Sequence, residues 1–291
     1  MTKERSMADG LRWLVTGASG MLGQDVVSTL EAAGRPVRSV GRDDLDVTDP
    51  EACRQVVAGA DVVVNCAAWT AVDDAEEREP AAFAVNAVGA ANVARAAREH
   101  GARVVQVSTD YVFAGDGTAP YAEDAPVLPL SAYGRTKAAG EWAVLAADGR
   151  NLVVRTAWLY GAGGPNFAAT MVRLVRERGA VSVVDDQRGQ PTWTADLADL
   201  IVRLVDADAP GGVYHGTSSG ATTWFGFARA AVASAGLDPA AVTPTTSAAF
   251  ARPAPRPSWS VLGHDALRAA GVEPIGPWDE RWATAAAAVV G

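Results

Sequence analysis

Tyr133 and Lys137 lie four residues apart in a segment predicted to form a helix that runs to about Ala147. Residues at this spacing share one face of an α-helix, so the two side chains are expected to lie side by side. A neighbouring ammonium lowers the pKa of a phenol, and a shift from about 10 to about 7 needs roughly 4 kcal/mol of favourable electrostatics, which requires a partly dry site and a neighbouring cofactor. A phenol tuned in this way donates a proton to a carbonyl oxygen while a hydride reaches the carbonyl carbon. We predict this role for Tyr133, with the hydroxyl of Thr109 or Ser108 hydrogen-bonded to the same oxygen.

A glycine turn near the start of the chain predicts a binding site for a dinucleotide. Gly17, Gly20 and Gly23 are three apart and separate an apolar stretch from a helix predicted over Met21–Ala33, which Gly34 closes. In such a turn, one glycine permits the tight bend, one lets the backbone approach a pyrophosphate, and one lets helix and strand pack closely. The helix N-terminus then offers free N–H groups to the phosphates. The alternative is a tight strand-to-helix turn without a ligand.

The residues after the second predicted strand, Pro36–Val40, bear on the choice between NAD and NADP. A site that prefers NAD places an acidic residue here to hold the ribose 2′-hydroxyl. Arg42 comes first in this chain, and it is suited to the 2′-phosphate of NADP; the alternative is a solvated surface arginine. Asp46 and Val47 follow where the next segment passes the adenine.

Alternating apolar runs and helical patterns predict the elements that position these residues. The expected strands are Pro36–Val40, Ala60–Cys66, Arg103–Ser108 and Asn151–Thr156, and the expected helices include Pro50–Val57 and Ala81–His100. Near-continuous apolar strands are typical of parallel sheets that are buried on both faces. Strands that alternate with helices indicate an α/β fold of the Rossmann type with a doubly wound parallel sheet, whose ligands bind at the carboxyl ends of the strands. Ser108 and Thr109 end one of these strands.

The second half of the chain predicts a smaller, interleaved substrate domain. Its expected elements are helices over Phe167–Arg178, Thr194–Asp206 and Thr223–Gly236, strands over Val181–Val184 and Gly212–His215, and a polar loop over Asp185–Thr192. We therefore divide the chain into a disordered leader at 1–10, a dinucleotide-binding domain at 11–160 with returning segments near 190–218, and a smaller domain at 161–189 and 219–291. Arg252 and Arg256 are candidates for binding a diphosphate, the alternative being surface arginines in a proline-rich loop.

Composition limits the class of protein. The net charge of the 291 residues is −9, which argues against non-specific binding to nucleic acid or to anionic membranes. Cys53 and Cys66 form no CxxC pair, and His215 and His264 have no partners at metal-ligand spacing. We therefore expect neither a disulfide framework nor a zinc site. We expect a cytoplasmic protein, because no apolar run is long enough to span a membrane and the leader lacks a signal-peptide core.

Taken together, these motifs resemble the extended short-chain dehydrogenases/reductases, and within them the dTDP-4-dehydrorhamnose reductase family. The resemblance extends from Leu14 to about Leu262. The segments that carry it are TGASGMLG, NCAAWTAVDDAE, VNAVGAANVARAA, VSTDYVFAGDG, YGRTKAAGE, RTAWLYG, NFAATMVRL, VVDDQRGQPTWTADLA and RPSWSVL. The three motifs STDYVF, YGRTK and DQRGQPT together are specific for this family, whereas any one of them alone is not.

The resemblance implies roles for individual residues. The implied cofactor contacts are Gly20, Met21 and Leu22 at the pyrophosphate, Asp46 and Val47 at the adenine, Ala67, Ala68 and Trp69 toward the nicotinamide, and Val107. The implied substrate contacts are Thr109, Asp110 and Trp158. Tyr133 is the implied proton donor, and Lys137 holds the nicotinamide ribose and lowers the tyrosine pKa.

Two positions depart from the family pattern. Trp69 stands where many members carry tyrosine or histidine. Asp25 lies near a position where some members have a glutamate at a Mg²⁺ site between subunits. Metal binding and the choice between a monomer and a homodimer therefore stay open.

The implied function is reduction of the C4 ketone of dTDP-4-dehydro-β-L-rhamnose to dTDP-L-rhamnose with NADPH, or with NADH. Reduction of another dTDP-4-keto-6-deoxysugar, as in dihydrostreptose synthesis, is an alternative with the same motifs. A 4,6-dehydratase is disfavoured because Asp110 is followed by Tyr111 and not by the glutamate of an Asp-Glu pair. An epimerase would retain its NAD, and a regulatory subunit of methionine adenosyltransferase would not need Tyr133 and Lys137.

Overall fold

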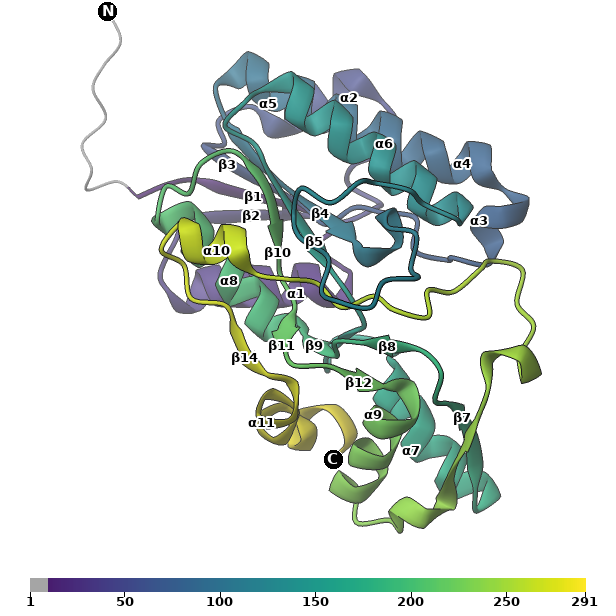
Figure 1. Cartoon of the computed structure of the whole chain (residues 1–291). Helices are drawn as coiled ribbons and strands as arrows, with labels where there is room; N and C mark the ends of the chain where they lie inside the picture. Colours follow the sequence, from purple (N-terminus) through teal and green to yellow (C-terminus); the bar gives the residue numbers. More distant parts are fainter. Residues whose placement is uncertain (1–9) are drawn as a thin grey trace, which may run out of the picture.

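A six-stranded parallel sheet forms the centre of the molecule (Figure 1). The computed structural model describes residues 10–291; residues 1–9, where we predict the leader, lie outside the described part. The strand order is β10-β5-β4-β3-β1-β2. The strands are β1 (Trp13–Thr16), β2 (Val37–Val40), β3 (Val62–Asn65), β4 (Arg103–Thr109), β5 (Leu152–Thr156) and β10 (Gly212–His215). This topology confirms the predicted doubly wound α/β fold.

Helices cover both faces of the sheet, as Figure 1 shows. One face carries α1 (Met21–Ala32) and α8 (Thr194–Asp206), and the other carries α2 (Pro50–Val57), α5 (Ala90–His100) and α6 (Ala132–Ala147). Adjacent residues of one strand point to opposite faces. Val15 accordingly packs in the core under α1 and α8, and Leu14 packs in the core under α2 and α5. No helix within residues 10–291 is both long and apolar enough to cross a membrane.

The helix predicted over Ala81–His100 is continuous in the structure, but its middle is π-helical and not α-helical. The short helices α3 (Asp74–Glu77) and α4 (Glu79–Phe83) come first, and a π-helical turn over Ala84–Gly89 precedes α5. The wider turn presents Asn86, whose side chain accepts from the Trp69 amide at 2.8 Å and donates to the Trp69 carbonyl at 3.1 Å. These contacts of Asn86 with a distant segment favour the π-helical turn. The periodicity of apolar residues in the sequence does not reveal such a turn.

Beyond the carboxyl ends of the strands, a third apolar cluster joins segments that are far apart in the sequence. It is built by α7 (Phe167–Arg178), β7 (Val181–Val184), α9 (Trp224–Ser234), β13 (Val242–Thr245) and α11 (Trp278–Val290). The segment predicted as a loop over Asp185–Thr192 contains instead two short strands that pair with distant partners. The remaining short elements are β6 (Leu159–Tyr160), β8 (Arg188–Gly189), β9 (Thr192–Trp193), β11 (Ser218–Ser219), β12 (Thr222–Thr223), α10 (Asp265–Ala269) and β14 (Ile275–Pro277).

Candidate active site

The start of α6 is held in place by contacts that set the position of Tyr133. Ser131 caps the helix by accepting a hydrogen bond from the Gly134 amide at 3.1 Å. A Cβ on Gly134 would clash with the carbonyl oxygen of Tyr111, so glycine allows the helix to lie against the segment that follows β4. The rings of Tyr111 and Tyr133 then meet edge to face, with centroids 5.6 Å apart. α6 therefore presents Tyr133 at the carboxyl end of β4.

Lys137 is buried one helical turn further along, with 4% of its surface exposed. Its ammonium donates a 2.6 Å hydrogen bond to the carbonyl oxygen of Val107 on β4. Burial lowers the pKa of Lys137 to about 8, while the charge of Glu141 opposes this change. The lysine is thus fixed on the strand that carries Thr109.

The pKa of Tyr133 is raised, and Lys137 is not among the groups that shift it. Burial has the largest effect, the negative charge of Asp110 adds to it, and the Thr109 hydroxyl opposes it. The reason lies in the direction of the lysine side chain, because its ammonium is committed to the Val107 carbonyl. A raised pKa keeps the phenol protonated at neutral pH, as a proton donor must be.

The two hydroxyls predicted at the end of β4 face in different directions. Ser108 Oγ donates at 2.5 Å to Glu141 Oε1 on α6, so the alternative that used Ser108 for the substrate is wrong. Thr109 Oγ1 donates at 2.9 Å to Oδ1 of Asp110. Burial raises the pKa of Asp110 to about 6, and the hydrogen bond from the Thr109 hydroxyl opposes the rise. Thr109 and Asp110 therefore remain as the polar pair beside Tyr133.

The glycine turn between β1 and α1 fits the pyrophosphate of a dinucleotide. Gly17 has a φ of 65°, and a Cβ there would lie 2.6 Å from the amide nitrogen of Ala67 at the end of β3. A Cβ on Gly23 would clash with the carbonyl oxygen of Gly17. Gly20 caps α1 without a side-chain hydrogen bond, and the first turn, which begins at Met21, contains no acidic residue. Free amides at a helix N-terminus whose first turn carries no carboxylate suit an anion.

A cavity of about 560 Å³ lies beside this turn, at the end of β2. Its lining residues are Ala18, Ser19, Gln24, Val27, Ser28, Ser39, Gly41, Arg42, Asp43 and Asp44. Arg42 is exposed, so its guanidinium is free to approach a ligand. Asp46 is also exposed and accepts hydrogen bonds from the amide and hydroxyl of Thr48, whereas Val47 is buried in the core under α5.

Ala67, Ala68 and Trp69 continue from the end of β3, and each is partly buried. Trp69 packs with Tyr133 around one small apolar cluster, and the guanidinium of Arg78 lies 4.7 Å from the centre of its ring. Asn86, which fixes the Trp69 backbone, was missed by the sequence analysis. An isolated asparagine within an alanine-rich helical segment was the available signal.

Trp158 lies two residues beyond β5 and has a φ of 47°, which is uncommon for a residue other than glycine. Its ring stacks on Trp224 with centroids 3.6 Å apart and planes inclined by 10°. Trp224 is partly buried, and its ring supports that of Trp158. Gly189 provides space on the other side, since a Cβ there would run into the Trp158 ring.

Arg252 and Arg256 both reach Asp73, which follows β3. Their guanidinium nitrogens lie 3.2 and 2.9 Å from Asp73 Oδ2, and the amide of Ala254 donates to Oδ1 at 3.3 Å. The proline-rich loop is thereby tied to the part of the chain that carries Trp69. Arg256 is close enough to Tyr111 for its positive charge to oppose the raised pKa of that phenol.

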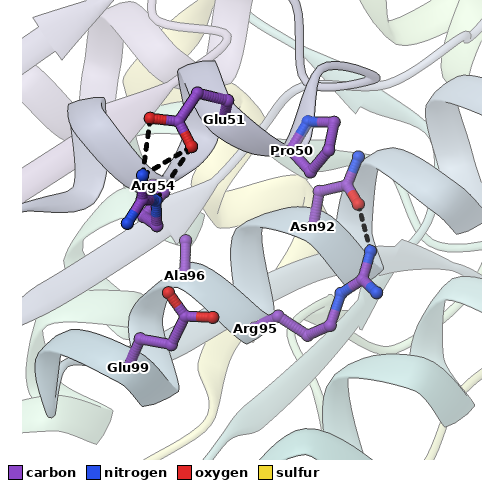
Figure 2. A pocket seen from close by; sticks show the side chains of 7 residues that line it. All are labelled: Pro50, Glu51, Arg54, Asn92, Arg95, Ala96 and Glu99. Carbon is purple, nitrogen blue, oxygen red and sulfur yellow. Dashed lines mark hydrogen bonds and ion pairs between the residues drawn. The ribbon is translucent and has the colours of Figure 1, made fainter.

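A second hollow lies between α2 and α5, away from these residues (Figure 2). Its lining residues are Pro50, Glu51, Arg54, Asn92, Arg95, Ala96 and Glu99. Its charged groups pair locally, as in the 2.7 Å contact between Arg54 and Glu51 and the hydrogen bond from Arg95 to Asn92. None of the predicted site residues lines this hollow.

Acidic, histidine and cysteine side chains do not gather into a metal site in the described part. Within residues 10–291, no three of them are placed to hold a metal ion. Asp25 on α1 is partly buried. Burial lowers the pKa of His215 to about 3 and that of His264 to about 4, so both imidazoles are neutral at pH 7.

Comparisons with known proteins agree on one family. The family model described as RmlD substrate binding domain matches residues 11–290. A dTDP-4-dehydrorhamnose reductase of Streptomyces griseus is 54% identical over 274 residues, which cover 92% of this chain and 90% of that protein. A dTDP-4-keto-6-deoxy-D-glucose reductase of Streptomyces niveus is 52% identical over 272 residues, covering 92% and 93%. The solved structure of a dTDP-4-dehydrorhamnose reductase from Bacillus anthracis in complex with NADP has a TM-score of 0.91 and 37% identity, covering 95% of this chain and 98% of that one.

Proposed function

The chain belongs to the RmlD substrate binding domain family, and we propose that it reduces the C4 ketone of dTDP-4-dehydro-β-L-rhamnose to dTDP-L-rhamnose with NADPH. The observation that carries this proposal is the meeting of Tyr133, Lys137 and Thr109 beside the end of β4, in a fold whose glycine turn fits a dinucleotide. A carbonyl reduction needs these two parts, a cofactor site and a proton donor.

The chain's own residues perform the binding and the proton transfer. A reduced nicotinamide dinucleotide, when bound, supplies the hydride that reaches C4 of the sugar. The turn at Gly17, Gly20 and Gly23 would hold the pyrophosphate of that dinucleotide, to which the first turn of α1 offers its amides. Tyr133 gives its phenolic proton to O4, and the C4 ketone becomes a hydroxyl. We assign Lys137, one turn along α6, to the ribose of the nicotinamide, which it would hold from its place on β4.

The sugar nucleotide is bound by residues from both halves of the chain. We assign Asp110 and the stacked ring of Trp158 to the sugar, since both follow strands at the carboxyl edge of the sheet. We assign Arg252 and Arg256 to the diphosphate, because guanidinium groups pair well with phosphate oxygens. In this proposal, Asp73 holds the two arginines at the site until the diphosphate engages them.

The experiment is NADPH oxidation with purified protein and dTDP-4-dehydro-β-L-rhamnose generated in situ, with NADH in parallel. We expect rapid oxidation with NADPH, and dTDP-L-rhamnose as the product identified by NMR. Cofactor binding without oxidation of NADPH or NADH would contradict the proposal.

A second candidate is reduction of another dTDP-4-keto-6-deoxysugar. The Streptomyces niveus relative, named as a dTDP-4-keto-6-deoxy-D-glucose reductase, is nearly as similar as the Streptomyces griseus one. Comparing kcat/KM for the two keto-sugars under one set of conditions decides between them. A higher kcat/KM for dTDP-4-keto-6-deoxy-D-glucose would replace the first proposal with the second.

A further inference from the structure

A buried ion pair lies directly behind the candidate active site. The side chains of Glu141 on α6 and Arg155 on β5 are 1% and 3% exposed. Glu141 Oε2 is 2.7 Å from Arg155 Nη2, and Arg155 Nε donates to Oε1 at 3.0 Å. Ser108 on β4 donates to the same Oε1 at 2.5 Å, and Arg155 Nη1 donates to the carbonyl of Glu123 at 3.1 Å. Both carboxylate oxygens are therefore occupied.

These contacts join the three elements on which the site is built. Tyr133, Lys137 and Glu141 follow each other at intervals of four on α6, so they share one face of the helix. Ser108 directly precedes Thr109 and pairs with Arg155 in the register of β4 and β5. Any movement of α6 relative to β4 would thus break contacts of Glu141.

Stability alone does not explain a buried ion pair here. Removing two charges from water is costly, and apolar residues of similar volume often replace such a pair without loss of stability. Glu141, however, also faces Lys137, which is itself buried and positively charged. Its charge counteracts the desolvation of that ammonium.

Three groups act on the Lys137 ammonium from the elements around it. They are Glu141 on its own helix, the Val107 carbonyl on β4, and the Cys66 thiol at the end of β3. Burial raises the pKa of Cys66 to about 12, so this thiol is neutral at pH 7. Of these three groups, Glu141 therefore supplies the negative charge.

We propose that Glu141 is a positioning residue, held by Arg155 and Ser108, that keeps Lys137 protonated and fixed on β4 during turnover. The part that concerns turnover rests on the proposed reductase function. The part that concerns the lysine is a property of the protein itself and can be measured without a substrate.

The sequence makes this measurement unusually direct. The chain contains two lysines, Lys3 and Lys137, so protein grown with lysine labelled with ¹³C at Cε gives two resonances. A Lys3→Arg variant assigns them. Titration of the Lys137 signal with pH then reports its protonation in wild type, Glu141→Gln and Arg155→Gln.

We expect the two substitutions to move the Lys137 midpoint in opposite directions. Glu141→Gln removes the negative charge and leaves Arg155 nearby, so the midpoint should fall by on the order of one pH unit. Arg155→Gln leaves the glutamate, so the midpoint should rise. An exposed control, Glu177→Gln on α7, should not move it. Equal midpoints in all of these proteins, or shifts of the same sign in the two buried variants, would overturn the proposal.

A double variant covers the case in which a single substitution fails to fold. Glu141→Leu with Arg155→Met replaces the ion pair by apolar side chains, and the Lys137 midpoint should fall because the negative charge that acts on Lys137 is lost. A midpoint equal to that of wild type would contradict our inference.

The pH profile of kcat tests the part that concerns turnover. Its alkaline limb should move to lower pH in Glu141→Gln and to higher pH in Arg155→Gln, as the NMR midpoints do. An NMR shift without a shift of this limb in an active enzyme would overturn the role in turnover. Failure of wild-type protein to oxidise NADPH would contradict the proposed function instead, and the NMR result would still stand.

Discussion

The Thr109 hydroxyl donates its proton to Oδ1 of Asp110 over 2.9 Å, while its oxygen accepts a hydrogen bond from the Tyr111 amide at 3.2 Å. A hydroxyl has one proton to donate, so Thr109 has none left for a substrate oxygen while Asp110 is ionised. The hydrogen bond from Thr109 to the substrate carbonyl stays a prediction, and it requires this proton to leave Asp110. Thr109 thus orients Asp110 as a donor and Tyr111 as an acceptor, and the phenol of Tyr133 is the proton donor to the substrate.

The buried carboxylate of Asp110 should make stability depend on pH. Burial raises its pKa from 3.8 to about 6, so between these values the native state binds the proton more tightly than the unfolded state. The contribution of Asp110 to the free energy of unfolding is therefore largest below about pH 4, and it is lost as the pH rises through 6. Relative to wild type, Asp110→Asn should gain about 3 kcal/mol in unfolding free energy between pH 4 and pH 7. Urea unfolding measures this, with exposed Asp124→Asn as the control; parallel curves for Asp110→Asn and wild type would refute it.

Replacement of Tyr133 by phenylalanine should abolish most turnover without loss of cofactor binding. A positioned general acid contributes about 10²–10⁴-fold, so kcat should fall by at least about 100-fold. Tyr111→Phe is the matched control, because the two rings touch and burial raises the pKa of both phenols. Steady-state kinetics and calorimetric titration with NADPH give the two readouts. Near-normal turnover in Tyr133→Phe, or an equal loss in both variants, would remove Tyr133 from its assigned role.

Arg42 should determine the preference for NADPH. If its guanidinium binds the 2′-phosphate, Arg42→Ala loses a hydrogen bond between charged groups that is worth about 1.5–3 kcal/mol. This corresponds to a fall of about 10- to 150-fold in kcat/KM for NADPH, with little change for NADH. Arg54→Ala, which removes an arginine of the hollow in Figure 2, serves as the control. An unchanged ratio between the two cofactors in Arg42→Ala would show that the preference arises elsewhere.

Arg256 should act on substrate binding more than on the chemical step. Its side chain is 21% exposed and lies within the group formed with Asp73. Arg256→Ala is expected to raise KM for the sugar nucleotide by about tenfold or more, because a charged contact to the diphosphate is lost. Arg268→Ala removes an exposed arginine that pairs with Asp265 and should leave KM unchanged. A change in kcat alone would argue that Arg256 has another role.

Much of the fold follows from local pattern. The predicted bounds of Pro50–Val57, Phe167–Arg178, Val181–Val184, Thr194–Asp206 and Gly212–His215 agree with the structure. These segments have clear apolar periodicity or strong caps, such as Asn166, whose side chain accepts from the Ala169 amide. The pairing of Tyr133 with Lys137 could also be predicted from the sequence, because residues four apart on a helix share a face wherever the helix lies.

The sequence by itself therefore determined the parallel α/β fold, the glycine turn and the pairing of Tyr133 with Lys137. Only the tertiary structure decided which way the polar side chains of the site point: Lys137 toward the Val107 carbonyl and Ser108 toward Glu141. Partners 30 and 33 residues away provide these contacts. Periodicity reports which face of an element is buried, whereas the direction of a buried polar group depends on the donors and acceptors that other elements bring to it.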